Sequence, residues 1–440
     1  MGMDPVLAIS LMVGLMLVLI GLEMPIAFAV AIAGSLGIVL LQDWNTLMYT
    51  LGTYPVGRIA SFQWTAIPLY ILLGNLAASS GVATDAYTMA NKWLGRMRGG
   101  LVLATIGASG MVAATTGSGS ASIAVMGKIA VPEMEKYGYD RSLACGATAS
   151  CGPLGILIPP SGQFVIIGVL AELSIGKLFM SGIFPGILTI LVFMTMVWIR
   201  CKLKPSLAPL GESYSWKEKI RSLSNAWGII VIFAVVIGGL YTGIATATET
   251  AAIGCFAALI MAVVAVTQKK SSWKRVWNAI LDTIGITSMI FAFIIGAGIF
   301  SLFITVSGVI PHALLAFQSI QVSVYLVVVF VIIIYLILGL FFDPMSMTMV
   351  TVPVLYPIIC GGMGVDPIWF SVIVVIMVEV SGLTPPVGLC LYMMKAVYPK
   401  ATLGEIIRGS MWFVAMDFVV IAILFAFPQI ATWLPSLMGK

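Results

Sequence analysis

The chain has 440 residues, of which 60% are hydrophobic and only 9% are charged. Soluble domains carry about 25% charged residues, so this composition excludes a soluble globular protein and predicts an all-α polytopic membrane protein. The net charge of +5 comes from basic residues scattered among loops, which argues against nucleic acid as a partner.

The sequence also limits the chemistry. His312 is the only histidine, and the six cysteines form no CxxC pair, so neither a multi-histidine nor a paired-cysteine metal site is expected. A glycine-rich Walker A loop is absent, which argues against a nucleotide as energy source. We therefore expect no metal cofactor, no nucleotide and no enzymatic activity.

Runs of about 18 or more apolar residues predict helices that cross a bilayer. In chain order, the ten predicted spans are 4–20, 24–41, 62–80, 143–171, 178–199, 226–242, 245–266, 283–308, 368–394 and 404–434. The basic amphipathic segment 83–98 is predicted to be an arm helix at the membrane interface.

Two further apolar regions, 100–135 and 323–360, are interrupted at their middle by "TTGSGSAS" and "FFDPMSMT". Irregular backbone at membrane depth is tolerated where protein buries it or where it lines a cavity. Each region is therefore predicted to be a re-entrant helical hairpin with a small, polar tip.

Two of the spans are themselves interrupted. "CGPLGILIPPSG" (151–162) stands inside 143–171, and "SGLTPPVG" (381–388) stands inside 368–394. Prolines and glycines break a helix and free backbone groups that can bind ions: carbonyls for a cation, and N–H groups at half-helix N-termini for an anion. Each hairpin tip with its broken helix therefore predicts an ion site.

The distribution of basic residues gives an orientation. If the hairpins do not cross, every lysine and arginine except Arg58, Lys177 and Lys440 falls on one side of the membrane. By the positive-inside rule that side is cytoplasmic. Both termini are then predicted to face out.

The two interrupted regions form an internal repeat. The distance from Asp140 to Pro159 equals that from Asp366 to Pro385, and Ser120 and Ser122 match Ser346 and Thr348 at the same offset. The orientation predicts opposite topology for the two halves, 1–225 and 226–440. Inverted repeats with broken helices are the pattern of secondary transporters.

The candidate site residues come from the tips and the breaks. Predicted ligands for at least two Na⁺ ions are Gly117, Ser118, Gly119, Ser120, Gly152, Pro159, Asp343, Ser346, Ser381, Gly382, Thr384 and Pro385. Predicted substrate-binding residues are Ser120, Ser122, Pro160, Ser161, Thr348 and Pro386.

Four acidic residues lie within or near predicted spans, where ionisable groups are functional candidates. Asp343 at the second tip is expected to be an ion ligand or the N-cap of the returning half-helix. Glu379 is expected to support the second break by hydrogen bonds. Glu249 is expected to cap or anchor a helix, and Asp417 to make a packing or subunit contact.

The sequence resembles the large membrane (permease) subunit of TRAP (tripartite ATP-independent periplasmic) transporters. The resemblance extends over nearly the whole chain. Its most specific stretches are "LGNLAASSGVA", "PEMEKYGYDRSLACGATASCGPLGILIPPS", "YTGIATATETAAIG" and "DPIWFSVIVVIMVEVSGLTPPVGLCLYMMK".

This resemblance implies a fold like that of the ion transporter superfamily and an elevator mechanism driven by a Na⁺ gradient. It also implies that the outer side, which both termini face, is the periplasm, and that the membrane is the inner membrane of a bacterium. It implies two protein partners: a small four-helix membrane subunit, expected as a separate chain, and a periplasmic substrate-binding protein. The cargo would be a small organic anion such as a carboxylate, a sugar acid or a sulfonate.

Three alternatives stay open at this point. A stand-alone Na⁺/carboxylate symporter of similar architecture would need no binding protein, and a channel is compatible with the composition. An intramembrane protease would need Asp140 and Asp343 side by side, whereas the charge pattern puts Asp140 in a loop.

Overall fold

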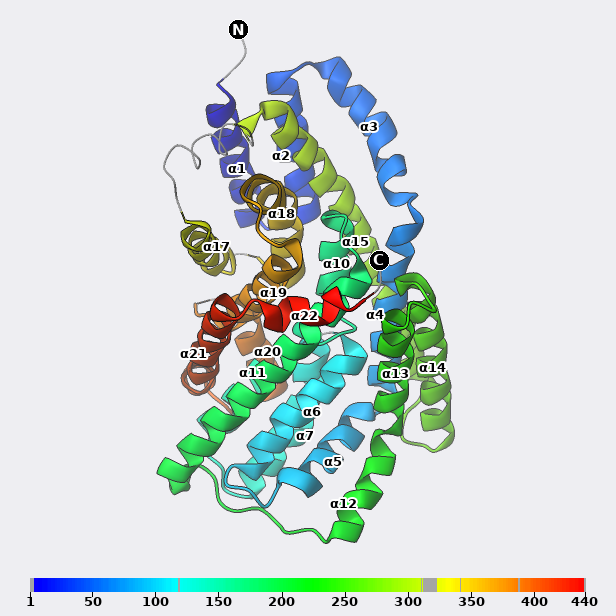
Figure 1. Ribbon diagram of the computed structural model, residues 1–440, viewed down its shortest axis with the longest axis vertical. Coiled ribbons are helices and arrows are strands. Elements are labelled where there is room, and N and C mark those ends of the chain that lie inside the picture. The colour runs from blue at the N-terminus through cyan, green and yellow to red at the C-terminus, as the bar shows by residue number, and fades with distance from the viewer. Residues whose placement is uncertain are drawn as a thin grey trace.

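The computed structural model describes residues 4–117, 119–309, 311, 323–340, 342–386 and 388–438. Almost all of them are helical (Figure 1), and the described part of the chain contains one isolated β-bridge, between Arg98 and Leu210. The all-helical prediction is confirmed. The predicted ligand Ser118 and the lone histidine, His312, lie outside the described residues.

The first half of the chain forms α1 (Pro5–Gly21), α2 (Ile26–Leu41), α3 (Trp44–Ile59), η1 (Phe62–Thr65), α4 (Ala66–Ser79), α5 (Val82–Leu94), α6 (Gly100–Thr116), α7 (Gly119–Lys136), α8 (Arg141–Cys151), α9 (Leu154–Leu157), α10 (Gly162–Leu170), α11 (Ile175–Leu203), η2 (Pro205–Leu207), α12 (Trp216–Leu223) and η3 (Ser224–Ala226). The second half forms α13 (Trp227–Tyr241), α14 (Ala247–Thr267), α15 (Trp273–Ser307), α17 (Val324–Leu338), α18 (Pro344–Tyr356), the π-helical turn η4 (Pro357–Gly362), α19 (Pro367–Leu383), α20 (Leu389–Val397), α21 (Leu403–Ala426) and α22 (Gln429–Ser436).

Several of these helices are long and apolar enough to cross a membrane. Among the described residues, five qualify by themselves: α11, α14, α15, α21, and α18 together with η4. Three bent pairs raise the number to eight, and one of them is α8–α9 with α10, bent by 41°. The chain is thus a multi-pass membrane protein, while the predicted total of ten spans stays a prediction.

The predicted interruptions occur at the expected places. The region 100–135 is the helical hairpin α6–α7, and 323–360 contains the second pair, α17 and α18. The spans 143–171 and 368–394 are each divided into shorter helices. The segment 83–98 contains the predicted interfacial helix as α5.

Three details differ from the predictions. The span 404–434 is two helices, because Pro428 lacks an N–H and disfavours a helical Phe427, which has φ −132° and ψ 71°. Helix α3 was not predicted, since its sequence is only weakly apolar. Helix α12 was not predicted either; Ser215 and Glu218 start it with a reciprocal capping box.

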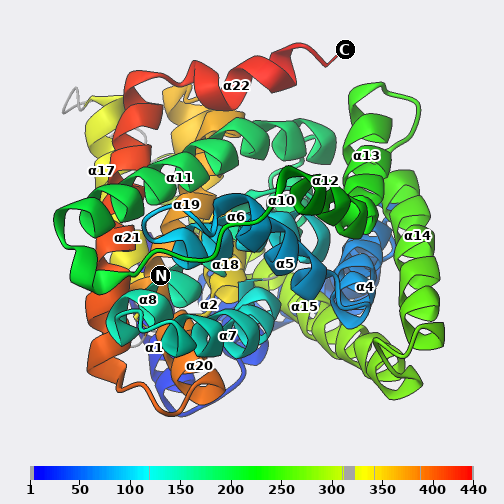
Figure 2. The same cartoon turned by 90° about the horizontal axis from the view of Figure 1, so that it is seen from below.

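Figures 1 and 2 show the arrangement from two directions. Helices α4, α13 and α14 lie at one side, α17 and α21 lie at the other, and α6, α10, α18 and α19 lie between them. Helices α6, α10, α18 and α19 of the predicted hairpins and broken helices are therefore in the interior, where irregular backbone is shielded from lipid, whereas α17 of the second region lies at the outer side.

Candidate functional site

The first hairpin tip contacts the first broken helix through glycine backbone. Helix α6 ends at Thr116, and Gly117 follows with φ +57°, a conformation that favours glycine. A Cβ on Gly117 would lie 2.6 Å from the Pro160 carbonyl oxygen, and one on Gly119 would lie 3.1 Å from Pro153 Cα. The tip therefore approaches the break more closely than residues with side chains would allow.

The second tip is built in a related way. A Cβ on Gly339 would lie 2.2 Å from the Ser381 Cβ, so the turn after α17 packs directly on the end of α19. The Asp343 carboxylate accepts hydrogen bonds from the backbone N–H groups of Met345 (3.0 Å) and Ser346 (3.2 Å). The predicted N-cap role of Asp343 is thereby confirmed.

The two breaks differ in detail. Between α8 and α10, the short helix α9 precedes the Pro159–Pro160 pair, whereas α19 leads straight into Pro385–Pro386 and then to Gly388, with φ +36°. Both Pro–Pro peptide bonds are cis.

Gln163 connects the first broken helix to the second hairpin. Its Nε2 donates to the Pro344 carbonyl oxygen (2.9 Å) and to Thr348 Oγ1 (3.1 Å), while its Oε1 is buried and has no hydrogen-bond partner. Sequence analysis missed this residue. The signal was present, because Gln163 is the one strongly polar side chain in the apolar half-helix 162–170.

A cavity of about 220 Å³ lies where both tips meet both breaks. Its polar lining combines Ser120 of the first hairpin, Gln163, Asp343 at the start of α18, and Glu379 of α19. Ile286 and Met289 of α15 form an apolar wall. Among the described residues, the lining contains no lysine, arginine or histidine, so no cationic side chain of this part of the chain faces the space.

The structure brings some predicted residues to the cavity and leaves others beside it. Gly117, Gly119, Ser120, Asp343 and Gly382 line it. The remaining described candidates are not part of this lining: Gly152, Pro159, Pro160, Ser161, Ser122, Ser346, Thr348, Ser381, Thr384, Pro385 and Pro386.

Most hydroxyls at the breaks donate to nearby backbone. Ser381 donates to Val378 O (2.8 Å), Thr384 donates to Val380 O (2.8 Å), and Ser161 donates to Ile156 O. A hydroxyl whose proton is engaged in this way presents only its lone pairs, which suits a cation better than an anion.

The remaining acidic candidates lie in different surroundings. Glu249 forms a capping box with Thr246 at the start of α14, so the predicted cap is confirmed. Glu379 and Asp417 are 1% and 0% exposed, and among the described residues none of their four carboxylate oxygens has a hydrogen-bond partner. The prediction that Glu379 supports the second break by hydrogen bonds is therefore wrong, because its carboxylate is buried without a donor. Complete burial within this chain leaves the Asp417 side chain unavailable for the predicted subunit contact.

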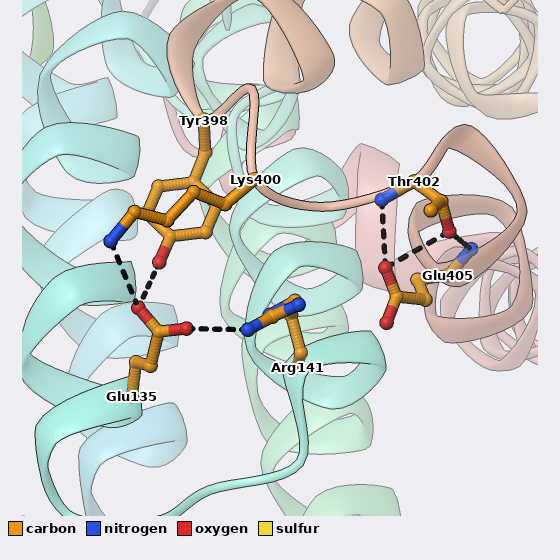
Figure 3. A network of polar contacts seen from close by, with 6 residues as sticks. All are labelled: Glu135, Arg141, Tyr398, Lys400, Thr402 and Glu405. Atoms are coloured by element: carbon orange, nitrogen blue, oxygen red, sulfur yellow. Dashed lines mark hydrogen bonds and ion pairs between the residues drawn. The ribbon is translucent and has the colours of Figure 1, made fainter.

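A charged network joins the C-terminal end of α7 to the loop between α20 and α21 (Figure 3). The Glu135 carboxylate accepts from Arg141 Nη2 (2.7 Å) and from the Tyr398 hydroxyl, and Lys400 lies 4.0 Å away. The Tyr398 and Arg141 hydrogen bonds hold the pKa of the Glu135 carboxyl below its usual range. Nearby, Thr402 and Glu405 form the capping box of α21, and the Thr402 hydrogen bonds lower the pKa of Glu405.

Similar chains and structures are known. The sequence matches the family described as tripartite ATP-independent periplasmic transporter, DctM component, over residues 13–430. It is 30% identical to the C4-dicarboxylate TRAP transporter large permease protein DctM of Pseudomonas aeruginosa, over 93% of this chain and 94% of that one. It is also 30% identical to the isethionate TRAP transporter permease protein DctMQ of Oleidesulfovibrio alaskensis, over 91% of this chain and 63% of that one.

The fold is similar to that of the YdaH transporter of Alcanivorax borkumensis, with a TM-score of 0.61, 15% identity, and coverage of 98% of this chain and all of that one. At this identity the likeness concerns the fold alone. The family match covers nearly the whole sequence, including both hairpins and both broken helices. The chain therefore belongs to the DctM (large permease) family of TRAP transporters, and it is a transporter component, not an enzyme.

Proposed function

We propose that this chain is the large membrane subunit of a Na⁺-driven TRAP transporter that imports a small organic anion. The observation that carries the proposal is the cavity at which both hairpin tips and both broken helices meet, in a chain of this permease family. Relatives named for C4-dicarboxylates and for isethionate support a carboxylate or sulfonate as cargo.

The side chains of the cavity suit Na⁺ ligation. Among the described residues, the Oε1 of Gln163 is a buried acceptor without a hydrogen-bond partner, and the Asp343 carboxylate lines the same cavity. An anion in the same cavity would be held by half-helix N–H groups and by the bound ions, since the lining contains no basic side chain. Binding of the anion would thereby depend on Na⁺, which is the coupling that a symporter needs.

We further propose that residues 1–225 and 226–440 are inverted repeats and that the hairpins with their broken helices move as an elevator. Both termini would face the periplasm. A small four-helix membrane subunit and a periplasmic binding protein would complete the transporter. The glycine contacts of Gly117 with residue 160 and of Gly339 with Ser381 support joint movement of each tip with its break.

Reconstitution tests this function. Proteoliposomes containing the chain, the small subunit and the loaded binding protein should accumulate substrate under an inward Na⁺ gradient, and should not do so under a K⁺ gradient. Liposomes with the chain alone should show no uptake. Equal uptake without the binding protein would identify a stand-alone Na⁺/carboxylate symporter instead.

A further inference from the structure

The buried carboxyl groups of Glu379 and Asp417 are not explained by the hairpin tips. An isolated ionised carboxylate is strongly destabilised in an apolar interior unless it is paired or bound to a cation. None of the ion pairs among the described residues includes either group, and their four oxygens accept no hydrogen bond. Burial without a partner leaves two ways to neutralise these groups, namely protonation or a bound cation.

The two side chains come from neighbouring helices. Trp369 Nε1 of α19 donates to the Leu424 carbonyl oxygen of α21 (2.9 Å), which sets the register of this antiparallel pair. Counting from this bond places Asp417 opposite residue 376, about one helical turn from Glu379. The two carboxyls are close enough to interact electrostatically.

A third helix ends at the same level. Ser410 of α21 donates to the Gly146 carbonyl oxygen of α8 (3.4 Å), and these two helices run in the same direction. Asp417 is seven residues after Ser410, and Pro153 is seven residues after Gly146, so Asp417 is level with Pro153, two residues past the end of α8 at Cys151. The carbonyl groups of the last helical turn have no partner within their own helix and carry partial negative charge.

Other polar groups near this point are also acceptors or weak donors. The Ser150 hydroxyl is fully buried and has no hydrogen-bond partner. The titratable neighbours are the Cys151 thiol, which interacts with both carboxyls, and the Cys390 thiol, which interacts with Glu379. Carboxylates, carbonyls and a hydroxyl thus occur at a similar level of these three helices, and none of the ion pairs among the described residues brings a cationic side chain to either carboxylate.

We propose that Glu379 and Asp417 bind a Na⁺ ion between α19, α21 and the end of α8, in addition to any ions at the hairpin tips. The inference rests on the proposed Na⁺ coupling. Ca²⁺ takes about six to eight oxygen ligands and Mg²⁺ keeps several waters. Among the described residues, no three His, Cys, Asp or Glu side chains are placed to hold a metal ion together. Two carboxylates completed by hydroxyl and carbonyl oxygens suit a monovalent ion.

The site would communicate with the transport cavity through Glu379, which lines that cavity while Asp417 does not. An ion entering from the cavity would reach Glu379 first and Asp417 behind it. Because α21 carries no residue of the predicted tip sites, this position would couple a helix outside the hairpins to ion binding.

Thermal unfolding of the purified chain in detergent, with EDTA, tests the proposal without substrate or partners. NaCl replacing choline chloride at constant ionic strength should raise the Tm. Asp417→Asn and Glu379→Gln should each raise the half-saturating Na⁺ concentration by about 10-fold or more, because about 1.4 kcal/mol is one decade. The double variant should add little, since both groups would hold one ion.

A second readout separates ligation from structure. Without Na⁺, Asp417→Asn should have a higher Tm than the unaltered chain, because it removes an uncompensated buried charge. Asp140→Asn is the matched control: Asp140 caps the exposed start of α8, and asparagine caps a helix about equally well. If Asp417→Asn does not fold, Glu379→Gln provides the same measurement.

Three outcomes would overturn the site. They are an unchanged Na⁺ response in both variants, stabilisation by protons but not by Na⁺, and a lower Tm of Asp417→Asn in Na⁺-free buffer. If Na⁺ stabilises the chain and only variants at Ser120 or Asp343 alter that response, the proposed Na⁺ coupling is supported and the Glu379–Asp417 site is refuted.

Discussion

At the scale of single residues, Asp343 has two separable roles. Its carboxylate caps α18 through Met345 and Ser346, and it also faces the cavity. Asparagine preserves a cap oxygen and removes the charge, so Asp343→Asn distinguishes the roles. If Asp343 is an ion ligand, Asp343→Asn should raise the Na⁺ concentration for half-maximal uptake by about 10-fold.

The control for this variant is Asp366→Asn. Asp366 caps α19 by the same chemistry, accepting from Ile368 N (2.8 Å) and Trp369 N (2.9 Å), and does not line the cavity. Ser120→Ala should shift the Na⁺ titration from the other tip. Titration curves that match the unaltered protein in both site variants would place the ions elsewhere.

Gln163 is the single side chain that ties the two halves of the site together. Gln163→Leu removes both of its hydrogen bonds, each worth about 0.5–1.5 kcal/mol, while the Pro344 carbonyl keeps the bond from Thr348. Uptake should fall by about 10-fold or more. Thr348→Val removes the bond from Gln163 to Thr348 and keeps the bond from Gln163 to Pro344. Its uptake should therefore lie between that of the unaltered protein and that of Gln163→Leu. Equal uptake by all three proteins would show that the cross-link is dispensable.

At the scale of helices, the Glu135 network connects α7 and α8 to the α20–α21 loop. The folded-state pKa of Glu135 is lowered, so its stabilising contribution is complete above the unfolded value of about 4.5 and is lost as pH falls through the folded pKa. Glu135→Gln removes the ion pair with Arg141. Its Tm should be below that of the unaltered chain at pH 7, and the difference should shrink below pH 4.

Glu133→Gln tests whether this effect belongs to the network. Glu133 precedes Glu135 by two residues on α7 and takes part in none of the ion pairs among the described residues. Its Tm should differ little from that of the unaltered chain at either pH. A pH-independent loss in Glu135→Gln would mean that packing, and not the charge, holds these helices together.

At the scale of the whole molecule, orientation is open to direct measurement. In a background without the six native cysteines, Ser213→Cys and Trp273→Cys should resist a membrane-impermeant thiol reagent in intact cells, because the positive-inside rule places them in the cytoplasm. Gly361→Cys should react, and its position has open space for a side chain. Labelling of position 213 from outside would refute the inverted repeat.

Local chemistry made much of the site predictable. Proline pairs and glycines located the two breaks, glycine and serine located the tips, and the Asp-Pro sequence at 343–344 located a cap. These signals depend on nearby residues. Local sequence could single out Gln163 as a polar side chain in an apolar half-helix, but not its partner, which is 181 residues away. The weakly apolar α3 lacks the signal of a span and could not be predicted.

The sequence could not predict where the chain is rigid. Gly146 and Gly409 bring α8 and α21 so close that a Cβ on either would overlap the backbone of the other helix, at 2.3 Å and 1.9 Å. Gly34 and Gly296 do the same for α2 and α15, at 2.7 Å and 2.3 Å. Nothing in the local pattern distinguishes these glycines from the exposed ones.

Those two glycine contacts restrict the relative movement of the helices that they join. Helices in backbone contact cannot slide past each other by exchanging side-chain rotamers. In the proposed elevator movement, α8 and α21 would therefore move together, and α2 would stay fixed to α15. Displacement would occur between the pair α8–α21 and the pair α2–α15, and not within either pair. The hydrogen bond from Trp369 of α19 to α21 connects the second broken helix to the same group of helices as the first. A movement of this group would displace both breaks together.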